Sequence, residues 1–302
     1  MGKVNYAAID IGSNAVRLLI KSIDDESIDT LFTKALLVRV PLRLGADAFL
    51  TGEISSKKSK NLLRLIKAYR QLMKIYDVVD YRACATSAMR DSKNGKKLIQ
   101  EIARKTGIKI EIINGEEEAK LVYDNHIEQL LDKNKNYIYV DVGGGSTEVS
   151  LISKGTLISS RSYNIGTVRI LEGKVKEEVP FIMKAELTQL AEIYPDIIII
   201  GSGGNINKLF RLSDQYNKKS IVFPIASLEK LATVLKSYSL EDRMKEFKLK
   251  PDRADVIIPA ADIFLHIAKY TKATTILVPT IGLVDGMIDS LYEKNVERKR
   301  KG

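Results

Sequence analysis

The sequence has few of the residues that build disulfides and metal clusters. Its 302 residues include one cysteine, Cys84, two histidines and no tryptophan. A single cysteine excludes an internal disulfide and any multi-cysteine zinc site, and it is typical of a protein from a reducing compartment. The two histidines do not stand at metal-ligand spacing. These absences give no support to a disulfide scaffold or to a cysteine- or histidine-based metal centre.

Long apolar runs are also absent. No run approaches the ~18 residues that a membrane helix needs, and the first residues lack the charged and then apolar segments of a signal peptide. The composition, with 45% apolar and 28% charged residues, is that of an ordinary globular protein. We therefore expect a cytoplasmic protein that does not bind membranes.

Positive charge is in excess. Lys and Arg number 48 against 38 Asp and Glu, which gives a formal charge of +10. Such an excess can hold a polyanion if it gathers on one face, but composition alone does not choose among nucleic acid, an anionic membrane and a phosphate-rich small molecule. Four of the charges belong to residues 298–301, which we interpret as a solvated end. We expect the others to line a phosphate-binding cleft.

Short β-branched runs alternate with stretches of helical spacing, which is the pattern of an α/β protein. The length favours two domains. Strands are predicted at residues 6–11, 16–23, 31–40, 81–85, 109–113, 137–142, 148–152, 156–163, 197–200 and 275–278. Helices are predicted at residues 53–76, 98–106, 181–193, 205–212, 228–235, 253–270 and 283–292.

An internal repeat is the most informative feature. Residues 10–20 and 141–151 both read as a strand ending in Asp, a glycine-containing turn and a returning strand. One Asp-x-Gly after a strand is usually only a hairpin turn. Two copies with matching flanks, one of them containing three consecutive glycines, instead predict a duplicated domain with a phosphate loop in each half. Arg17 in the first copy corresponds to Glu148 in the second.

With these residues in view, the sequence resembles the exopolyphosphatase and guanosine pentaphosphate phosphatase (Ppx/GppA) family. The resemblance spans about residues 6–292. Besides the two repeats, it rests on residues 85–91 (Ala-Thr-Ser-Ala-Met-Arg-Asp), 114–119 (Asn-Gly-Glu-Glu-Glu-Ala), 166–169 (Gly-Thr-Val-Arg), 201–204 (Gly-Ser-Gly-Gly), 253–257 (Arg-Ala-Asp-Val-Ile) and 282–286 (Gly-Leu-Val-Asp-Gly).

The resemblance implies an α/β fold of duplicated actin-like (ribonuclease H-like) ATPase domains with an interdomain cleft. The first domain is expected at residues 1–124 and the second at 125–282, with residues 283–302 forming a helix that packs back on the first. Dimers are common in such families, although the sequence reveals no self-complementary face. Longer relatives carry a further helical region.

The resemblance further implies hydrolysis of terminal phosphoanhydride bonds in inorganic polyphosphate or guanosine pentaphosphate, with Mg²⁺ (or Mn²⁺) as cofactor. Such chemistry needs positioned cations, converging N–H donors and an oriented nucleophile. The alternative from another class is a regulator that binds the polyanion without hydrolysing it. A kinase of the same superfamily is a weaker interpretation, and no module for reading nucleic acid accompanies the charge.

Two glutamates are candidates for the general base. The resemblance favours Glu118, with Glu117 as the fallback, to orient and deprotonate the attacking water. The ordinary interpretation is structural, because Asn114 is a good N-cap and carboxylates in a first helical turn stabilise the helix dipole.

The remaining candidates would hold metal and phosphate. Asp141 and Glu148, joined by Asp10, are expected near the metal, because Mg²⁺ prefers carboxylates, waters and phosphate oxygens. The ligand of the loop at residues 201–205 stays open, because Asn205 stands where many relatives have threonine. The expected phosphate-binding residues are Ser13, Asn14, Arg17, Arg90, Gly143, Gly144, Gly145, Ser146, Gly203 and Gly204.

Overall fold

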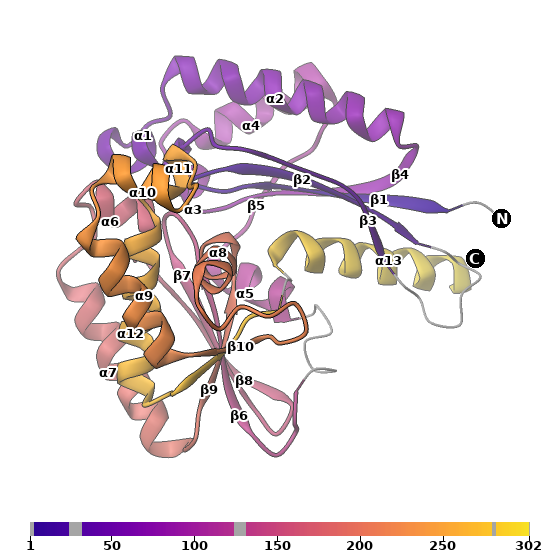
Figure 1. Cartoon of the computed structure of the whole chain (residues 1–302). Helices are drawn as coiled ribbons and strands as arrows, with labels where there is room; N and C mark the ends of the chain where they lie inside the picture. Colours follow the sequence, from indigo (N-terminus) through magenta and orange to yellow (C-terminus); the bar gives the residue numbers. More distant parts are fainter. Residues whose placement is uncertain (1–2, 24–31, 124–130, 280–281, 302) are drawn as a thin grey trace. The chain divides into compact units, whose positions relative to one another are not determined.

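A computed structural model describes residues 3–23, 32–123, 131–279 and 282–301 (Figure 1). The chain divides into two compact units. Unit 1 comprises Met1–Asn125 and Leu283–Gly302, and unit 2 comprises His126–Gly282.

Unit 1 is built on a five-stranded sheet. Its strands lie in the order β3-β2-β1-β4-β5, with the β1, β2 and β3 strands antiparallel and β4 and β5 parallel to β1. From Tyr6 onward every residue of β1 is buried, as expected for a central strand covered on both faces. The bounds are β1 Val4–Ile11, β2 Val16–Ile23, β3 Thr33–Val40, β4 Val78–Ala85 and β5 Glu111–Ile112.

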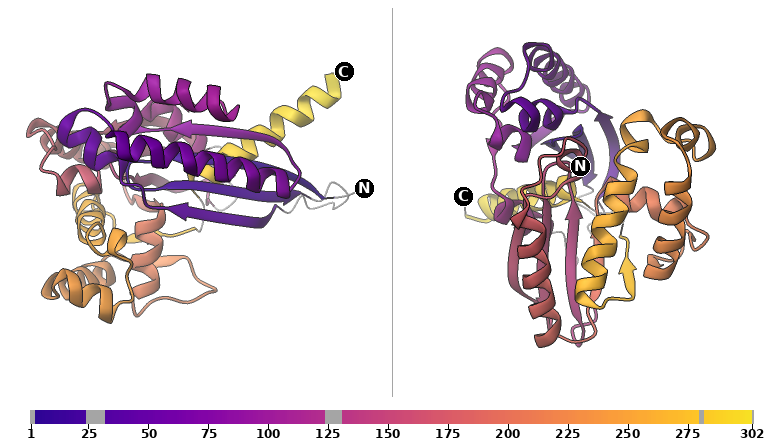
Figure 2. Two further views of the ribbon diagram at one scale, coloured as in Figure 1. Left: turned by 90° about the horizontal axis from the view of Figure 1, so that it is seen from above. Right: turned by 90° about the vertical axis from the view of Figure 1, so that its left-hand side faces the viewer.

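Helices cover both faces of this sheet (Figures 1 and 2). Helices α2 and α4 pack together on one face, whereas α13 lies on the other face against β1 and α5. The buried side of α2 consists of apolar residues three or four positions apart, and Ser55 caps the helix by accepting a hydrogen bond from the Lys58 N–H. The bounds are α1 Leu44–Thr51, α2 Ser56–Ile75, α3 Ser87–Asp91, α4 Gly95–Thr106, α5 Gly115–Tyr123 and α13 Leu283–Lys301.

A buried ion cluster holds α13 against the sheet. Lys21 on β2 places its Nζ 2.9 Å from Asp285 Oδ1 and 3.5 Å from Asp289 Oδ1, and all three residues are buried. One turn further along the helix, the Tyr292 ring packs edge-on against Tyr6. A helix whose Asp289 is 268 residues from Lys21 in sequence therefore completes the core of unit 1.

Unit 2 repeats this topology. Its sheet has the order β10-β11-β9-β6-β7-β8, so that β8-β7-β6-β9-β11 corresponds strand for strand to the sheet of unit 1. The strands are β6 Asn136–Val142, β7 Thr147–Ser153, β8 Thr156–Tyr163, β9 Ile198–Ser202, β10 Val222–Pro224 and β11 Thr275–Leu277. The helices are α6 Thr167–Leu171, α7 Glu178–Ile193, α8 Gly204–Leu212, α9 Ile225–Ser237, α10 Leu240–Glu246, α11 Pro251–Ala254 and α12 Ile257–Thr271. The duplicated α/β fold expected from the sequence is confirmed.

Some local predictions were wrong. Residues 253–270 do not form one helix, because α11 ends at Ala254 and α12 begins at Ile257. The short elements α1, α3, α6, α10 and β10 were not predicted, because segments of three to eight residues carry little periodicity. The final helix extends beyond the predicted residue 292 to Lys301. Among the described residues, no helix is long and apolar enough to cross a membrane.

We expect Lys21→Ala to destabilise unit 1 by about 3 kcal/mol, because it leaves two buried carboxylates without their shared cation. The measurement is the free energy of unfolding in urea. Lys34→Ala is the matched control, since Lys34 pairs with Lys21 across β2 and β3 and is exposed. A loss below about 1 kcal/mol, similar to that of an ordinary surface substitution, would contradict this role of the cluster.

Candidate functional site

The two repeated segments form equivalent hairpins. Gly12 N–H donates to the Ala15 carbonyl at 3.1 Å, and Gly143 N–H donates to the Ser146 carbonyl at 3.0 Å. The strand registers match as well, because Asp10 pairs with Arg17 and Asp141 pairs with Glu148. Each Asp is thus the second-last residue of its strand, before Ile11 in β1 and Val142 in β6.

In unit 2 the start of α6 binds the carbonyl groups of the glycine turn. Thr167 N–H donates to the Gly143 carbonyl at 3.0 Å, and the N–H groups of Val168 and Arg169 donate to the Gly144 carbonyl at 2.8 and 3.0 Å. The Arg169 guanidinium also donates to the Gly145 carbonyl at 2.7 Å. All three carbonyls therefore point toward α6.

The orientation of the carbonyls fixes that of the N–H groups. In a trans peptide the N–H of one residue points opposite to the carbonyl of the residue before it. The N–H groups of Gly144, Gly145 and Ser146 therefore point away from α6, on one side of the turn. Successive N–H groups with this arrangement form a concave site for an anion.

Gly166 permits this packing. A Cβ added at Gly166 would lie 2.4 Å from the nitrogen of Gly145 and 2.5 Å from the carbonyl carbon of Gly144. Both atoms belong to the backbone, so neither can rotate away. A residue with a side chain at this position must push α6 and the turn apart.

The turn of unit 1 is held in the same way by the start of α1. Gly45 N–H donates to the Ser13 carbonyl at 2.8 Å and Arg43 N–H to the Asn14 carbonyl at 2.9 Å. The N–H groups of Asn14 and Ala15 consequently point away from α1. A Cβ added at Gly45 would lie 2.8 Å from the Ser13 Cβ, so this turn too depends on a glycine behind it.

The Ser13 side chain contacts the protein itself. Its hydroxyl lies 2.8 Å from the Ser87 hydroxyl and accepts a hydrogen bond from Ala88 N–H at 3.1 Å. Ser13 is buried. The hydroxyl thus connects the first turn to the start of α3, a contact that was not predicted from the sequence.

Arg17 and Asp10 form an ion pair. Arg17 Nη1 donates to Asp10 Oδ2 at 2.8 Å, and the Arg17 side chain is about one-third exposed (32%). Burial raises the pKa of Asp10, although the charge and the hydrogen bond of Arg17 act in the opposite direction. In unit 1 the repeated Asp therefore already has a cationic partner.

In unit 2 the equivalent pair is two carboxylates. Asp141 and Glu148 are direct cross-strand neighbours, and Glu148, 2% exposed, accepts hydrogen bonds from the hydroxyls of Ser146 at 2.7 Å and Ser162 at 2.9 Å. Gly203, with φ of 95°, allows the next loop to approach, because an added Cβ would lie 2.8 Å from Asp141 Oδ1. Like charges directly opposite one another are unfavourable unless a cation is shared.

The two candidate glutamates differ in their surroundings. Asn114 caps α5 by accepting a hydrogen bond from Glu117 N–H at 2.8 Å, as predicted. The Glu117 carboxylate, 43% exposed, lies 2.9 Å from Arg82 Nη2, which also binds Glu111. Glu118, in contrast, is buried at 9% exposure. Of the two, Glu117 therefore has the surroundings of a surface ion pair.

Arg90 is partly buried at the end of α3. Its Nη1 donates to the Ile113 carbonyl at 3.1 Å, and its Nε lies 3.6 Å from Asp91 Oδ1. Ile113 directly precedes Asn114, so Arg90 is linked to the segment that carries the glutamates.

A second cationic group surrounds the start of α8. The Arg253 guanidinium donates to Asn205 Oδ1 and lies 2.8 Å from a Cβ added at Gly204. Partial burial, together with the charges of Arg211 and Arg253, lowers the pKa of Lys208. No role had been assigned to Arg253 or Lys208 from the sequence, although Arg253 begins one of the family-like motifs.

The described part of the chain contains no group of three or more His, Cys, Asp or Glu residues that could hold a metal.

The sequence comparisons agree on one family. The chain matches the Ppx/GppA phosphatase family over residues 19–295. It is 28% identical to a bifunctional 3-dehydroquinate synthase/phosphatase of Fusobacterium nucleatum (90% of this chain, 44% of the relative). It is also 29% identical to exopolyphosphatase 2 of Mycobacterium tuberculosis (60% and 58%). A guanosine-5′-triphosphate,3′-diphosphate pyrophosphatase of Aliivibrio fischeri is 22% identical (96% and 61%). The chain thus spans about half of the length of these curated relatives.

Solved structures share the fold. The Ppx/GppA family member of Aquifex aeolicus is 26% identical, with a TM-score of 0.76 over 97% of this chain and 99% of its own. An exopolyphosphatase from Cytophaga hutchinsonii is 22% identical, with a TM-score of 0.84 over 96% and 98%. The repeated hairpins, the shared fold and a match over most of its length place this chain in the Ppx/GppA phosphatase family.

Proposed function

We propose that this protein releases orthophosphate from the terminal phosphoanhydride of inorganic polyphosphate or guanosine pentaphosphate, with Mg²⁺ or Mn²⁺ as cofactor. The observation that carries the proposal is the turn of unit 2, whose carbonyls are bound by the start of α6 so that successive N–H groups face the other side. The names of the curated relatives, an exopolyphosphatase and a guanosine-5′-triphosphate,3′-diphosphate pyrophosphatase, support this choice of substrates.

The turn would hold the phosphate under attack. The N–H groups of Gly144, Gly145 and Ser146 are fixed before substrate arrives, so stabilising the charge on the transferring phosphoryl group requires no reorganisation. In unit 1 the N–H groups of Asn14 and Ala15 offer a second such site. Ser13 would contribute through its backbone, since its hydroxyl is bound to α3.

Glu118 would act as the general base. A carboxylate that deprotonates water needs a low-dielectric setting, which burial gives to Glu118. Glu117 is the weaker candidate, because its carboxylate is partly exposed and already forms an ion pair with Arg82. Glu117 and Glu118 both lie in the first turn of α5. Substituting each glutamate separately therefore tests which of them acts as the base.

Asp141 and Glu148 would hold the metal, and Asp10 is the corresponding carboxylate of unit 1. Two facing carboxylates fit Mg²⁺, which keeps several waters and binds substrate phosphates directly. When bound, the ion would neutralise charge on the phosphate oxygens. The hydroxyls of Ser146 and Ser162 orient Glu148 for this role.

Cations would bind the rest of the phosphate chain. Arg90 is the candidate in unit 1. In unit 2 the candidates are Arg253, which lies beside Gly204, and Lys208 on α8, whose pKa is lowered by partial burial and in part by the charge of Arg253. Arg17 would offer phosphate only its remaining N–H groups, because its Nη1 donates to Asp10. A guanidinium suits bidentate phosphate contacts.

The test is phosphate release from polyphosphate and, separately, from guanosine pentaphosphate, each with Mg²⁺ and with a chelator. We expect metal-dependent release from at least one substrate. Tight binding without release from either would favour the alternative, a regulator that binds the polyanion without cleaving it.

We expect Glu118→Gln to lower kcat by about 10²- to 10⁴-fold, the usual contribution of a general base, with little change in binding. Glu117→Gln is the matched control and should change kcat only slightly. The measurement is steady-state phosphate release together with substrate affinity in chelator. If Glu117→Gln were the inactive variant, the assignment of the base would be reversed.

Gly166→Ala should also abolish most activity, because the added methyl group displaces the backbone of Gly144 and Gly145. Gly173→Asn serves as a control, since Gly173 has φ of 63° and open space around an added Cβ, and Asn tolerates such a conformation. Phosphate release and the thermal unfolding midpoint are measured for both. Full activity of a folded Gly166→Ala protein would contradict the proposed turn.

A further inference from the structure

The positive charge of unit 1 is concentrated on helices α2 and α4. Helix α2 carries seven Lys and Arg and no Asp or Glu, and α4 carries four Lys and Arg against one Glu. Together they hold an excess of ten positive charges, as large as the formal charge of the whole chain. The sequence led us to expect the excess positive charge in a phosphate-binding cleft. The Lys and Arg residues of α2 and α4 instead lie on two neighbouring helices.

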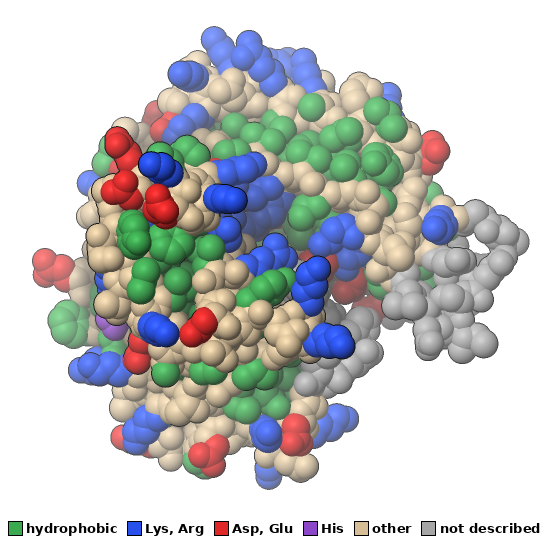
Figure 3. Space-filling view, in the orientation of Figure 1, with side chains coloured by type: hydrophobic (Ala, Val, Ile, Leu, Met, Phe, Trp, Pro, Cys, Tyr) green, Lys and Arg blue, Asp and Glu red, His purple; other side chains and the backbone are tan. Residues whose placement is uncertain are grey.

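Six of these residues form a regular stripe. We define the α2 stripe as Lys57, Lys60, Arg64, Lys67, Arg70 and Lys74. They are three or four positions apart, so they lie on one side of the helix, and all are exposed. Figure 3 shows Lys and Arg side chains gathered at the upper edge, over α2. The stripe covers seventeen residue steps, or about 26 Å at 1.5 Å per residue.

The stripe is not balanced by acidic neighbours. Within the described residues, none of its six members forms an ion pair; Arg64 donates to Asn61 Oδ1 at 3.3 Å. Like charges three or four residues apart on a helix destabilise it. An ordinary solvated helix face mixes both signs and relieves this repulsion. The α2 stripe would be relieved only by an anion from outside.

One end of the stripe lies near the first phosphate turn. Lys58 Nζ donates to the Arg43 carbonyl at 2.6 Å, and Arg43 N–H donates to the Asn14 carbonyl at 2.9 Å. Helix α2 therefore starts beside the residues that hold the turn of unit 1. From there the stripe leads away along the helix.

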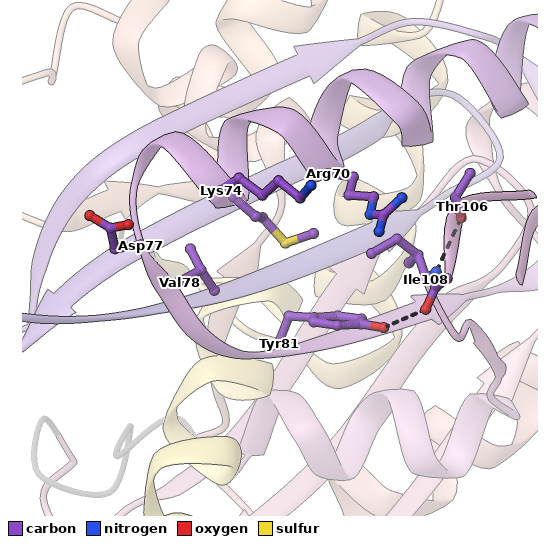
Figure 4. Close-up of a pocket in the computed structure, with 9 residues that line it drawn as sticks. Arg70, Lys74, Asp77, Val78, Tyr81, Thr106 and Ile108 are labelled. Atoms are coloured by element: carbon purple, nitrogen blue, oxygen red, sulfur yellow. Dashed lines mark hydrogen bonds between the residues drawn. The ribbon is translucent and has the colours of Figure 1, made fainter.

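The other end overlies a pocket of about 410 Å³, whose lining includes Met73, Tyr81 and Ile108 (Figure 4). The ends of the Arg70 and Lys74 side chains lie near each other over it, while Asp77 lies apart at its far end (Figure 4). Two adjacent cations at this point extend the positive track to the last turn of α2.

We propose that the α2 stripe is an accessory binding surface for the distal part of a long polyphosphate chain. Residues three or four positions apart are about 5 Å apart along the helix axis, at 1.5 Å per residue. A linear chain of phosphates can contact such a row of cations along its length, whereas a single small anion would contact only one or two of them. This inference rests on the proposed substrate class but not on hydrolysis.

Other extended anions fit less well. Proteins that hold single-stranded nucleic acid stack its bases on aromatic side chains, and the only aromatic residue of α2, Tyr69, is buried with its hydroxyl donating to the Val16 carbonyl. A membrane-surface helix needs a broad apolar face, and on α2 the only large apolar residue that is well exposed among the described residues is Ile75.

The experiment compares two full-length variants of equal charge. The stripe variant carries Lys57→Gln, Lys60→Gln, Arg64→Gln and Lys67→Gln. The control variant carries Lys174→Gln, Lys176→Gln, Lys184→Gln and Lys245→Gln, all at exposed positions of unit 2. Binding of end-labelled long-chain polyphosphate and of tripolyphosphate is measured in chelator across a range of salt concentrations, so the result does not depend on turnover.

We expect the stripe variant to bind the long chain at least tenfold more weakly at low salt, with tripolyphosphate binding unchanged. Its slope of log affinity against log salt should fall by about 3, at ~0.7 per lost contact to a single strand. The control variant should behave as the unsubstituted protein. An equal loss of affinity for long-chain polyphosphate in both variants, or no loss of affinity in either, overturns the proposal. Stripe-dependent binding of single-stranded RNA as tight as that of polyphosphate also overturns it, in favour of nucleic acid.

Discussion

The candidate site depends on one constraint, the binding of the hairpin carbonyls by the first N–H groups of a following helix. The start of α6 does this for Gly143 and Gly144, and the start of α1 does it for Ser13 and Asn14. In a trans peptide the N–H points opposite to the carbonyl of the preceding residue. The N–H groups of each turn therefore point away from the helix that binds its carbonyls. The glycines behind the turns, Gly45 and Gly166, allow the close approach.

The same scaffold carries different chemistry in its two copies. Asp10 faces Arg17 in unit 1, and Asp141 faces Glu148 in unit 2. The first pair is an ion pair, whereas the second consists of two carboxylates. Two hairpins of the same geometry therefore place different charges opposite the repeated Asp, Arg17 in unit 1 and Glu148 in unit 2.

Much of this could be predicted from the sequence, because it follows from chain order and repetition. The equivalence of residues 10–20 and 141–151 predicted the shared register, and Asn114 was recognised as the cap of α5. Contacts between distant segments were not predictable. The Ser13 hydroxyl meets Ser87, and Glu117 meets Arg82, only because the sheet brings β4 beside β1 and β5. Pro259 lies in the first turn of α12 and is compatible with a helix that begins at Ile257, but residues 253–270 were predicted as one helix from their apolar spacing. The stripe on α2 was not recognised, because the positive charge was considered only as a total for the whole chain.

The central claim is that preoriented N–H groups of the second turn bind phosphate. The most direct measurement is the amide ¹⁵N–¹H spectrum of the protein titrated with tripolyphosphate in chelator, where no turnover interferes. We expect the Gly144, Gly145 and Ser146 amides to shift most in unit 2, in the direction of stronger hydrogen bonding, and we expect Gly166→Ala to remove these shifts. Saturable binding that leaves these three amides unchanged would contradict it.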